Sequence, residues 1–380
     1  METKKYRFDE VTINFDKKRI PLSSAQREKR QGTFRYYGAQ GVIDHVDDYI
    51  YDGTYLLIAE DGENLKSKKQ NIAQVVDGQF WVNNHAHIVQ GNEQCDTRFL
   101  CYLINSMDLS GYVTGSAQPK LSQANLNAIT LSLPTLVEQK RIVEYLYMLD
   151  QKIDVNRQIN DNLEQQAQSY FQELFVDNAD PEWAIGTISD LGTVVGGSTP
   201  SKAKPEYYTE SGIAWITPKD LSINKSKFVS HGENDITELG LKNSSAAIMP
   251  EGTVLFSSRA PIGYIAIAAG EVTTNQGFKS VVPKPGIGTP FVYFFLKNTL
   301  PVIEGMASGS TFKEVSGSTM KNVPAVIPDA ETLAKFSDFC APIFAQQRIL
   351  EEQNQSLATL RDNLLPKLMS GEIDVSDVQL

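Results

Sequence analysis

The sequence predicts an α+β protein in which two similar mixed α/β globular domains are separated by two long coiled-coil helices. One seam of apolar residues recurs every three or four positions in the middle of the chain, and a second seam follows 194 residues later. This spacing is typical of a coiled coil rather than of the broader apolar stripe of a surface helix. We therefore expect a first globule over 1–133, a helix over 134–178, a second globule over 179–327 and a second helix over 328–380.

The first long helix is predicted to run from about Pro134 to Phe175. The seam positions expected to join the two helices are Leu149, Ile153, Asn160, Leu163, Ile343, Leu350, Asn354 and Leu357. Asn160 and Asn354 are equivalent in the two copies. A polar seam residue costs stability but disfavours wrong alignments, so we expect these asparagines to help fix how the helices pair. The second helix should end near Ser370-Gly371, a glycine C-cap signal.

The repeat begins upstream of the helices. Ser122 corresponds to Ser316 at the same offset of 194 residues, without a gap from there into the helices. Further upstream the copies drift, but Val82-Asn83-Asn84-His85 still resembles Thr273-Thr274-Asn275-Gln276. A whole unit has therefore been duplicated, and the chain reads as globule, helix, globule, helix.

Strand and turn signals describe both globules as α+β. The elements predicted in the first are a turn at Asp52-Gly53, strands at 54–59 and 80–82, and a short helix near 98–106. Those predicted in the second are strands at 253–257 and 264–268 and a helix near 291–300.

The composition is that of a globular protein of two or three domains, with 380 residues, 41% of them apolar and 21% charged. Of the net charge of −11, the two helical segments carry −9, which leaves both globules close to neutral and able to present a basic face. No apolar run approaches the roughly 20 residues of a membrane span, and no apolar leader opens the chain, so we expect a cytoplasmic protein. The three cysteines form no CxxC pair and are expected to be reduced structural thiols.

The known catalytic and metal motifs are absent or incomplete. There is no P-loop, and Gly286-Ile287-Gly288 lacks the third glycine of a dinucleotide site. His85 and His87 could supply half of a metal site, although satisfied or base-contacting histidines are the alternative. Glu138-Gln139-Lys140 matches a fragment of many nuclease sites but lies in the first turns of a helix, where a solvated face explains it. We therefore predict no catalytic residue, metal site or cofactor in this chain.

Polar side chains in Gly/Ser-rich loops instead suit phosphate positioning and readout of base edges. The candidates in the first globule are Lys17, Arg19, Tyr36, Tyr37, Lys66, Lys68, Lys69, His85 and Lys120. The candidates in the second are Lys202, Lys204, Tyr207, Lys219, Arg259, Asn275, Gln276 and Lys313. For any single lysine the alternative is a solvated loop, because exposed lysines are common on every surface.

Over nearly its whole length the chain resembles the specificity subunit of type I restriction-modification systems. Residues 134–142 with 149–153 look like the first conserved region of that family, and 360–373 are similar to the second. Tyr36-Tyr37-Gly38-Ala39 resembles one subtype of target recognition domain, and Gly197-Ser198-Thr199-Pro200 resembles another.

The resemblance implies two target recognition domains at opposite ends of an antiparallel helix pair, related by a pseudo-two-fold repeat. Each would read half of a split double-stranded DNA target, which should be asymmetric because the globules differ in almost every loop. Two modification subunits, which hold S-adenosylmethionine, and restriction subunits would be the partners, and ATP and Mg would also bind to partners. The chain departs from the pattern in the second repeat, where Glu138-Gln139 becomes Thr332-Leu333.

Two other classes of function compete with this interpretation. A self-contained nuclease or methyltransferase would need the catalytic motif that is missing. A coiled-coil scaffold would use its globules to bind protein rather than DNA, and salt-dependent binding to a DNA with two half-sites would distinguish it.

Overall fold

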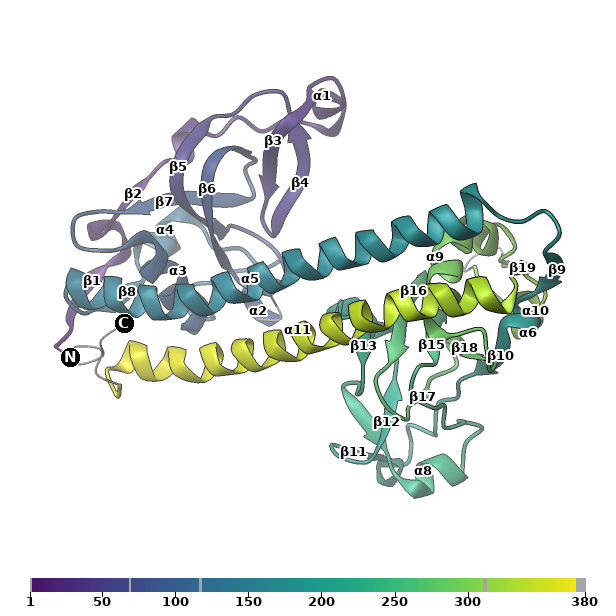
Figure 1. The fold of residues 1–380 in the computed structure, drawn as a ribbon. Helices are drawn as coiled ribbons and strands as arrows, with labels where there is room; N and C mark the ends of the chain where they lie inside the picture. The colour runs from purple at the N-terminus through teal and green to yellow at the C-terminus, as the bar shows by residue number, and fades with distance from the viewer. Residues whose placement is uncertain (1, 68–69, 116–117, 310–312, 374–380) are drawn as a thin grey trace. The chain divides into compact units, whose positions relative to one another are not determined.

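The computed structural model describes residues 2–67, 70–115, 118–309 and 313–373. The chain forms two compact units, one of Met1–Ile153 with Ser356–Leu380 and the other of Asp154–Gln355. Each unit contains one globule and a stretch of both long helices, α5 (Leu136–Gln172) and α11 (Ala330–Ser370) (Figure 1). A short π-helical turn, Glu173–Asp177, follows α5, and α11 ends at the predicted glycine signal.

A six-stranded sheet is the centre of the first unit, with the strand order β2-β7-β5-β6-β3-β4. These strands are β2 (Thr12–Asn14), β3 (Gln31–Gly38), β4 (Gly41–Val46), β5 (Tyr51–Ala59), β6 (Ala73–Val82) and β7 (Ala86–Gly91). The short helices are α1 (Ser24–Glu28), α2 (Asn64–Ser67), α3 (Thr97–Ser106) and α4 (Gln123–Asn127). Among the described strands of this sheet, only β3 and β6 pair in parallel. The predicted strands and the short helix near 98–106 are confirmed.

The predicted turn at Asp52-Gly53 is wrong, because both residues lie inside β5. Gly53 faces Gly78 across the antiparallel pair of β5 and β6, and both glycines have positive φ angles of 128° and 85°. A glycine inside a strand often marks a local irregularity in the ladder. Here the two opposed glycines adopt the positive φ angles, so both strands continue through the Asp-Gly sequence, which usually forms a turn.

The described residues of the second unit form sheets with the orders β10-β18-β15-β16-β13, β11-β14-β12-β17 and β19-β9. Its strands are β9 (Ala184–Thr187), β10 (Gly192–Gly196), β11 (Tyr208–Thr209), β12 (Ile213–Ile216), β13 (Phe228–Val229), β14 (Asn234–Ile236), β15 (Val254–Ser258), β16 (Ile262–Ala268), β17 (Thr273–Thr274), β18 (Lys279–Pro283) and β19 (Pro324–Ile327). Its helices besides the long pair are α6 (Ile188–Leu191), α7 (Pro218–Ile223), α8 (Glu238–Lys242), α9 (Thr289–Gly305) and α10 (Gly317–Lys321).

Both predicted strands of the second unit are confirmed, in β15 and β16. The helix predicted near 291–300 is longer, because α9 continues through Pro301 to Gly305. A proline inside a helix removes one backbone hydrogen bond. Ile303, which is buried in the core of this unit, holds the following turn against the sheet.

The internal repeat is confirmed at the level of single residues. Helix α4, strand β8 (Thr130–Leu133) and the first residue of α5 recur, each 194 residues later, as α10, β19 and the first residue of α11. Ser122 and Ser316 are the equivalent N-caps, and the hydroxyl of each accepts a hydrogen bond from the backbone N–H three residues further on. Each unit therefore has the same antiparallel two-stranded sheet before its long helix, β1 (Lys4–Arg7) with β8 and β9 with β19.

The second repeat has Thr332 where the first has Glu138, yet the N-terminal capping contact of the long helix is preserved. Before α5, the hydroxyl and the backbone N–H of Thr135 both donate to the Glu138 carboxylate, at 2.8 and 2.9 Å. At the start of α11, the hydroxyl and the N–H of Thr332 donate to Asp329, both at 2.8 Å. Positions 329 and 332 are the equivalents of 135 and 138, so the threonine and the carboxylate have exchanged places while the contact remains. Such contacts satisfy N–H groups that a helix start leaves unpaired.

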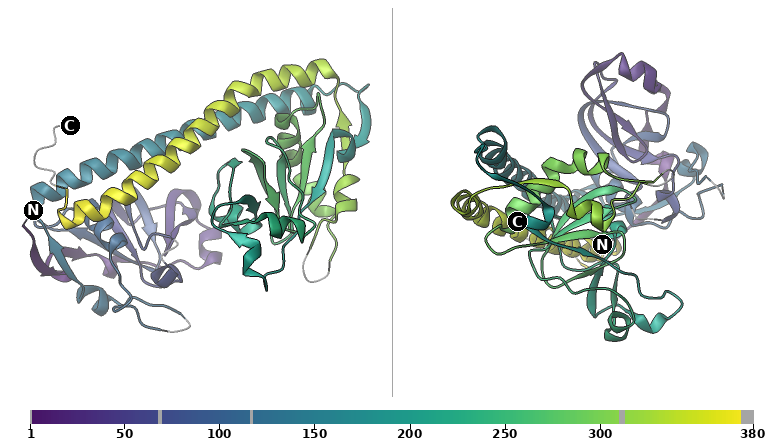
Figure 2. Two further views of the ribbon diagram at one scale, coloured as in Figure 1. Left: turned by 90° about the horizontal axis from the view of Figure 1, so that it is seen from below. Right: turned by 90° about the vertical axis from the view of Figure 1, so that its right-hand side faces the viewer.

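The two long helices pack antiparallel within each unit (Figures 1 and 2). In the first unit Arg361 Nη1 donates to Asp150 Oδ1 at 2.7 Å, and in the second Asn156 Nδ2 donates to Asn354 Oδ1 at 2.9 Å. Among the seam positions proposed from sequence, the buried residues are Ile153, Ile343 and Leu350. The half-buried ones are Leu149, Asn160, Leu163, Asn354 and Leu357.

Asn160 and Asn354 do not meet each other in this pairing. The partner of Asn354 is Asn156, because the helices run antiparallel. Asn160 instead forms a reciprocal pair with Gln347, in which the side-chain amide of each donates to the backbone carbonyl of the other, at 3.3 and 3.2 Å. The polar layer therefore consists of Asn156, Asn160, Gln347 and Asn354 rather than of the two equivalent asparagines alone.

Candidate nucleic-acid interface

A groove of about 610 Å³ in the second unit brings together five of the side chains proposed from sequence. They come from four separate segments: Lys202 from the loop after β10, Lys219 from α7, Arg259 from the position after β15, and Asn275 with Gln276 from the turn after β17. Three of these five side chains are cationic and two are amides. Cations suit phosphates and amides suit base edges, so the groove combines both kinds of contact.

The wall of the groove is built from hydrogen bonds between its loops and strands. Trp215 Nε1 donates to the Ser198 carbonyl at 3.0 Å, and Tyr208 Oη donates to the Pro200 carbonyl at 2.6 Å. The backbone N–H of Ser198 donates to the Thr274 carbonyl at 2.8 Å. Gly197 is required beside this contact, because a Cβ there would lie 2.0 Å from the Asn275 carbonyl oxygen. The loop that carries Lys202 is thus held directly against the turn that carries Asn275.

Two carboxylates also line the groove, and both are engaged. Asp220 is buried and accepts hydrogen bonds from Thr217, at the start of α7, and from the backbone N–H of Glu233. The Glu233 side chain forms an ion pair with Lys219, and this hydrogen bond and charge raise the pKa of the lysine. Arg259 lies 3.5 Å from Glu314. Exposed ion pairs of this kind are weak, so an incoming phosphate can compete for Lys219 and Arg259.

Three other candidates of the second unit lie outside this groove. Lys313 lines a neighbouring cavity, which shares Arg259 with the groove. Lys204 is exposed, with its Nζ 3.9 Å from Glu206 and 5.6 Å from the ring centroid of Tyr207. Tyr207 itself is only 7% exposed, so its ring supports the loop and offers little surface to a ligand.

In the first unit, three candidates are structural residues rather than surface contacts. Tyr36 is fully buried and Tyr37 is 5% exposed, because consecutive side chains of β3 point to opposite faces of the sheet and both faces are packed. Arg19 donates to Glu60 and to the Ala86 carbonyl, both at 2.9 Å. Tyr36 and Tyr37 are buried and the Arg19 guanidinium is engaged by these hydrogen bonds, so the three side chains offer little surface to a base or a phosphate.

The remaining candidates of the first unit that the structure describes are exposed: Lys17, Lys66, His85 and Lys120. Lys66 Nζ donates to the Gly115 carbonyl at 2.8 Å, and Lys120 pairs with Glu60 at 3.2 Å. His85 Nδ1 lies 2.7 Å from Asp61 Oδ2. Lys68 and Lys69 lie outside the described residues.

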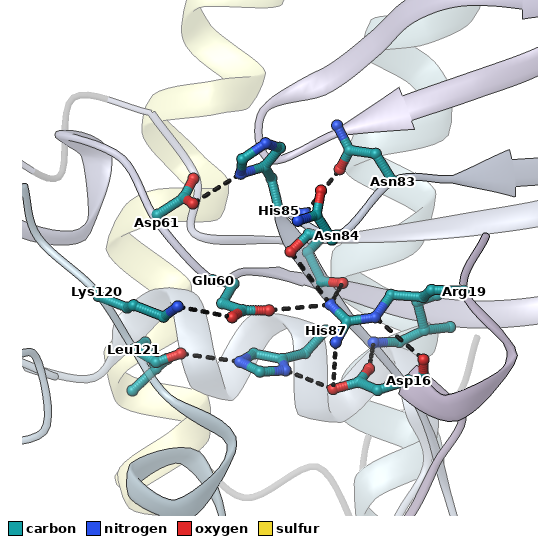
Figure 3. A network of polar contacts seen from close by, with 12 residues as sticks. Asp16, Arg19, Glu60, Asp61, Asn83, Asn84, His85, His87, Lys120 and Leu121 are labelled. Carbon is teal, nitrogen blue, oxygen red and sulfur yellow. Dashed lines mark hydrogen bonds and ion pairs between the residues drawn. The ribbon is translucent and has the colours of Figure 1, made fainter. Parts of the chain in front are cut away.

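His87, two residues after His85, is a satisfied histidine, which was the alternative that the sequence offered, and it belongs to a buried polar network (Figure 3). The ring is 1% exposed; Nδ1 lies 2.6 Å from Asp16 Oδ2 and Nε2 lies 2.8 Å from the Leu121 carbonyl. Both partners are acceptors, so the ring donates from both nitrogens when it is protonated. Burial lowers the pKa of His87, but the hydrogen bonds and the charges of Asp16 and Glu60 outweigh it and raise the pKa overall.

His85 and His87, which could have supplied half of a metal site, belong to separate contacts. The two rings have different carboxylate partners, Asp61 and Asp16 respectively. Within 2–67, 70–115, 118–309 and 313–373, no three histidine, cysteine or acidic side chains are grouped so that they could hold a metal ion. The alternation of His85 and His87 in the sequence was the signal for this network, although it does not reveal Asp16.

Across the described ranges of the chain, no helix is both long and apolar enough to cross a membrane.

Two repeated globules on paired helices, one of them carrying a cationic groove lined by amides, define a two-domain nucleic-acid recognition protein. The family model described as "Type I restriction modification DNA specificity domain" matches residues 2–165 and 181–360. The chain therefore belongs to the family of type I restriction-modification specificity subunits, as the conserved regions in its sequence predicted.

Individual relatives are consistent with this membership. The chain is 40% identical over 191 residues to the type I restriction enzyme MjaIX specificity subunit of Methanocaldococcus jannaschii, an alignment that covers 48% of this chain and 44% of that subunit. It is 23% identical over 404 residues to the HindI specificity subunit of Haemophilus influenzae, covering 85% of this chain and 84% of that one. The crystal structure of the type I restriction-modification S subunit from M. genitalium shares the fold, with a TM-score of 0.58 and 16% identity over 97% of this chain and 96% of that one.

Proposed function

We propose that this chain gives a type I restriction-modification complex its DNA sequence specificity, with each globule reading one half of a split, asymmetric duplex target. The observation that carries the proposal is the groove of the second unit, where Lys202, Lys219 and Arg259 surround Asn275 and Gln276. Cations position a phosphate backbone, and amides in the same groove can then distinguish base pairs. The asymmetry follows from the different loops of the two globules.

The partners in this proposal are two modification subunits and the restriction subunits. S-adenosylmethionine, ATP and Mg²⁺ would bind to those partners. The complex would act in the cytoplasm, and the chain alone would neither methylate nor cleave DNA. Methyl transfer from S-adenosylmethionine by the purified chain would contradict this part of the proposal. A scaffold whose globules bind protein is the competing function, but nothing in such a role requires cations and amides in one groove.

Salt-dependent binding tests the proposal against that scaffold. Removing one lysine–phosphate interaction should reduce the slope of log affinity against log salt by about 1. We expect the double variant Lys202→Ala/Lys219→Ala of the full chain to bind duplex DNA more weakly at every sequence and with a flatter slope. Lys321→Ala, an exposed lysine of α10 outside the groove, is the matched control and should leave the slope unchanged. Equal slopes for all three proteins would show that DNA does not enter this groove.

A further inference from the structure

The turn that follows β17 in the second unit has a structural twin in the first unit, after β6. In the second unit β12 and β17 pair in parallel, and Asn275 N donates to the carbonyl of Ile216, the last residue of β12, at 3.0 Å. In the first unit β3 and β6 pair in parallel, and Asn83 N donates to the carbonyl of Tyr37, next to the end of β3, also at 3.0 Å. The third parallel pair among the described strands, β13 with β16, makes the same backbone bond, from Ala269 N to the Val229 carbonyl at 3.0 Å, but alanine has no side-chain amide that could close a turn.

The side chains close both turns in the same way. Asn83 Oδ1 accepts from the backbone N–H of His85 at 2.8 Å, and Asn275 Oδ1 accepts from the N–H of Gly277 at 2.8 Å. An asparagine that bonds to the backbone two residues on mimics one turn of the chain and fixes the residue between. The residue between is Asn84 in the first unit and Gln276 in the second.

A tryptophan anchors each of these turns to the loop near the start of its globule. Trp81, two residues before Asn83, donates from Nε1 to the Ile20 carbonyl at 2.6 Å. Trp215 lies on β12, where it pairs with Thr273, two residues before Asn275. Its Nε1 donates to the Ser198 carbonyl at 3.0 Å. Both indole rings are buried, so the turns rest on rigid parts of each globule.

Asn84 and Gln276 are both exposed, and both carry a side-chain amide. An amide offers one acceptor and one donor side by side, which matches the N7 acceptor and N6 donor of adenine in the major groove. The Thr199 hydroxyl donates to Gln276 Oε1 and so orients this amide. A carbonyl oxygen has two lone pairs, so Gln276 Oε1 can still accept a second hydrogen bond from a base.

We propose that these equivalent turns are the base-reading elements of the two globules, and that Asn84 and Gln276 each read an A·T pair in one half-site. Asn83 and Asn275 are the positioning residues that hold the turns. The inference rests on the proposed function, and it adds a residue, Asn84, that was not among the candidate DNA contacts proposed from sequence. The sequence repeat placed Asn84 opposite Asn275, and the turns of the structure shift that alignment by one residue. The surrounding cations, Lys202 and Arg259 in the second unit, would hold the phosphate backbone while Gln276 reaches the base edge.

Selection from a randomised duplex library by the full chain tests the inference. Asn84→Ala should lose the base preference at one position of one half-site, and Gln276→Ala at one position of the other. The preference for A·T at that position should fall by about 5- to 150-fold, the range of one bidentate contact. All other positions and the salt slope should remain as in the wild type. Gln346→Ala removes an exposed amide of α11 and is the control that should change no position.

The outcomes separate this inference from the function on which it rests. Because both side chains are exposed, the variants should melt at the wild-type temperature, so a reduced preference cannot come from unfolding. The inference is wrong if the wild type selects a split target and both variants select that same target, or if the affected position is a G·C pair. The proposed function would stand in either case. A wild-type chain that selects no sequence would overturn both.

Discussion

Lys227 Nζ donates to Glu164 Oε2 at 2.7 Å and so joins the start of β13 to helix α5 in the second unit. The lysine side chain is 7% exposed and its Nζ lies 3.6 Å from the ring centroid of Phe344 on α11. Glu351, also on α11, accepts from the backbone N–H groups of Lys227 and Phe228 at 2.8 and 3.1 Å. One short segment is therefore bonded to both long helices.

Removing the carboxylate should destabilise this unit. Burial lowers the pKa of Lys227 to about 8, although Glu164 acts in the opposite direction. Without Glu164 the ammonium would be buried without its main counter-charge, and breaking one side of a buried pair typically costs about 3–5 kcal/mol. We expect Glu164→Ala to reduce the hydrogen-exchange protection of the β15 amides by that amount.

Glu173→Ala is the matched control for this variant, because Glu173 follows the same helix and is exposed. It should change protection by less than about 0.5 kcal/mol. Equal effects of the two variants would show that helix composition, and not the pair with Lys227, stabilises the unit.

The contact between Asn156 and Asn354 predicts coupled effects on melting. Asn156 is buried, and its Oδ1 has no hydrogen-bond partner among the described residues. Replacing Asn354 alone by Leu removes the closer acceptor of Asn156 Nδ2 and leaves only Gln353 Oε1 at 3.4 Å, whereas replacing both asparagines removes the buried polar groups together. We expect each single Leu variant to melt lower than the double variant, and the double variant to melt at or above the wild type but with less specific helix alignment.

A double-mutant cycle on the melting free energy measures this coupling, which is typically about 0.5–3 kcal/mol for residues in contact. The pair Asn160→Leu and Asn354→Leu is the control, because these residues do not meet. Additive effects at Asn156 and Asn354 would contradict the pairing of these two side chains.

His87 predicts a pH-dependent contribution to the stability of the first unit. Its folded pKa is raised above the usual 6.5, so its contribution is fully present below about pH 6.5 and is lost as the pH rises through the folded pKa. The pKa of Asp16 is lowered from 3.8: burial raises it, but His87, Ile88 and Arg19 lower it more. The Asp16 contribution is therefore present above about pH 3.8 and lost as the pH falls through its folded pKa.

The wild type should accordingly exceed His87→Gln in melting temperature most between about pH 4 and pH 6.5, and less at about pH 8.5. Thermal melts of both proteins at these values test the prediction. His45→Gln, which changes an exposed histidine of the same sheet, should show no such trend. A difference between wild type and His87→Gln that is constant with pH would contradict the assignment.

The helix pair predicts how the spacer of a split target is set. Because Asn156 faces Asn354, four residues inserted after Asn156 need four more inserted after Gln353 to keep the alignment. The insertions add about 6 Å along the axis, which corresponds to one or two base pairs at roughly 3.4 Å each. In complex with a modification subunit, we expect methylation to shift to targets with the longer spacer and unchanged half-sites.

The same four residues inserted into the loop after Asp180, outside both helices, serve as the control and should leave the spacer unchanged. If the paired insertion still selects the original spacer, the helices do not measure the distance between half-sites.

Periodic features of this protein could be predicted from its sequence alone. The long helices, their seam and the repeat at 194 residues are carried by spacing, which depends on helix geometry and not on what the helix touches. The same holds for Ser122 and Ser316, because an N-cap is a contact between residues three apart. The groove residues Lys202, Asn275 and Gln276 could be proposed as DNA contacts from their residue type and loop context. The sequence did not show that they are neighbours.

Only the tertiary structure decided which polar residues face solvent and which residues meet. Tyr36 and Lys219 both suit a nucleic-acid site by chemistry, but Tyr36 is buried because both faces of the sheet are packed at β3, and that packing is set by contacts distant in sequence. Asn354 meets Asn156 rather than its equivalent Asn160 because the helices run antiparallel. The sequence repeat matched the segments of the twin turns but placed Asn84 opposite Asn275. Only the hydrogen bonds of the structure showed that Asn84 corresponds to Gln276, since pairing depends on the whole fold and not on local spacing.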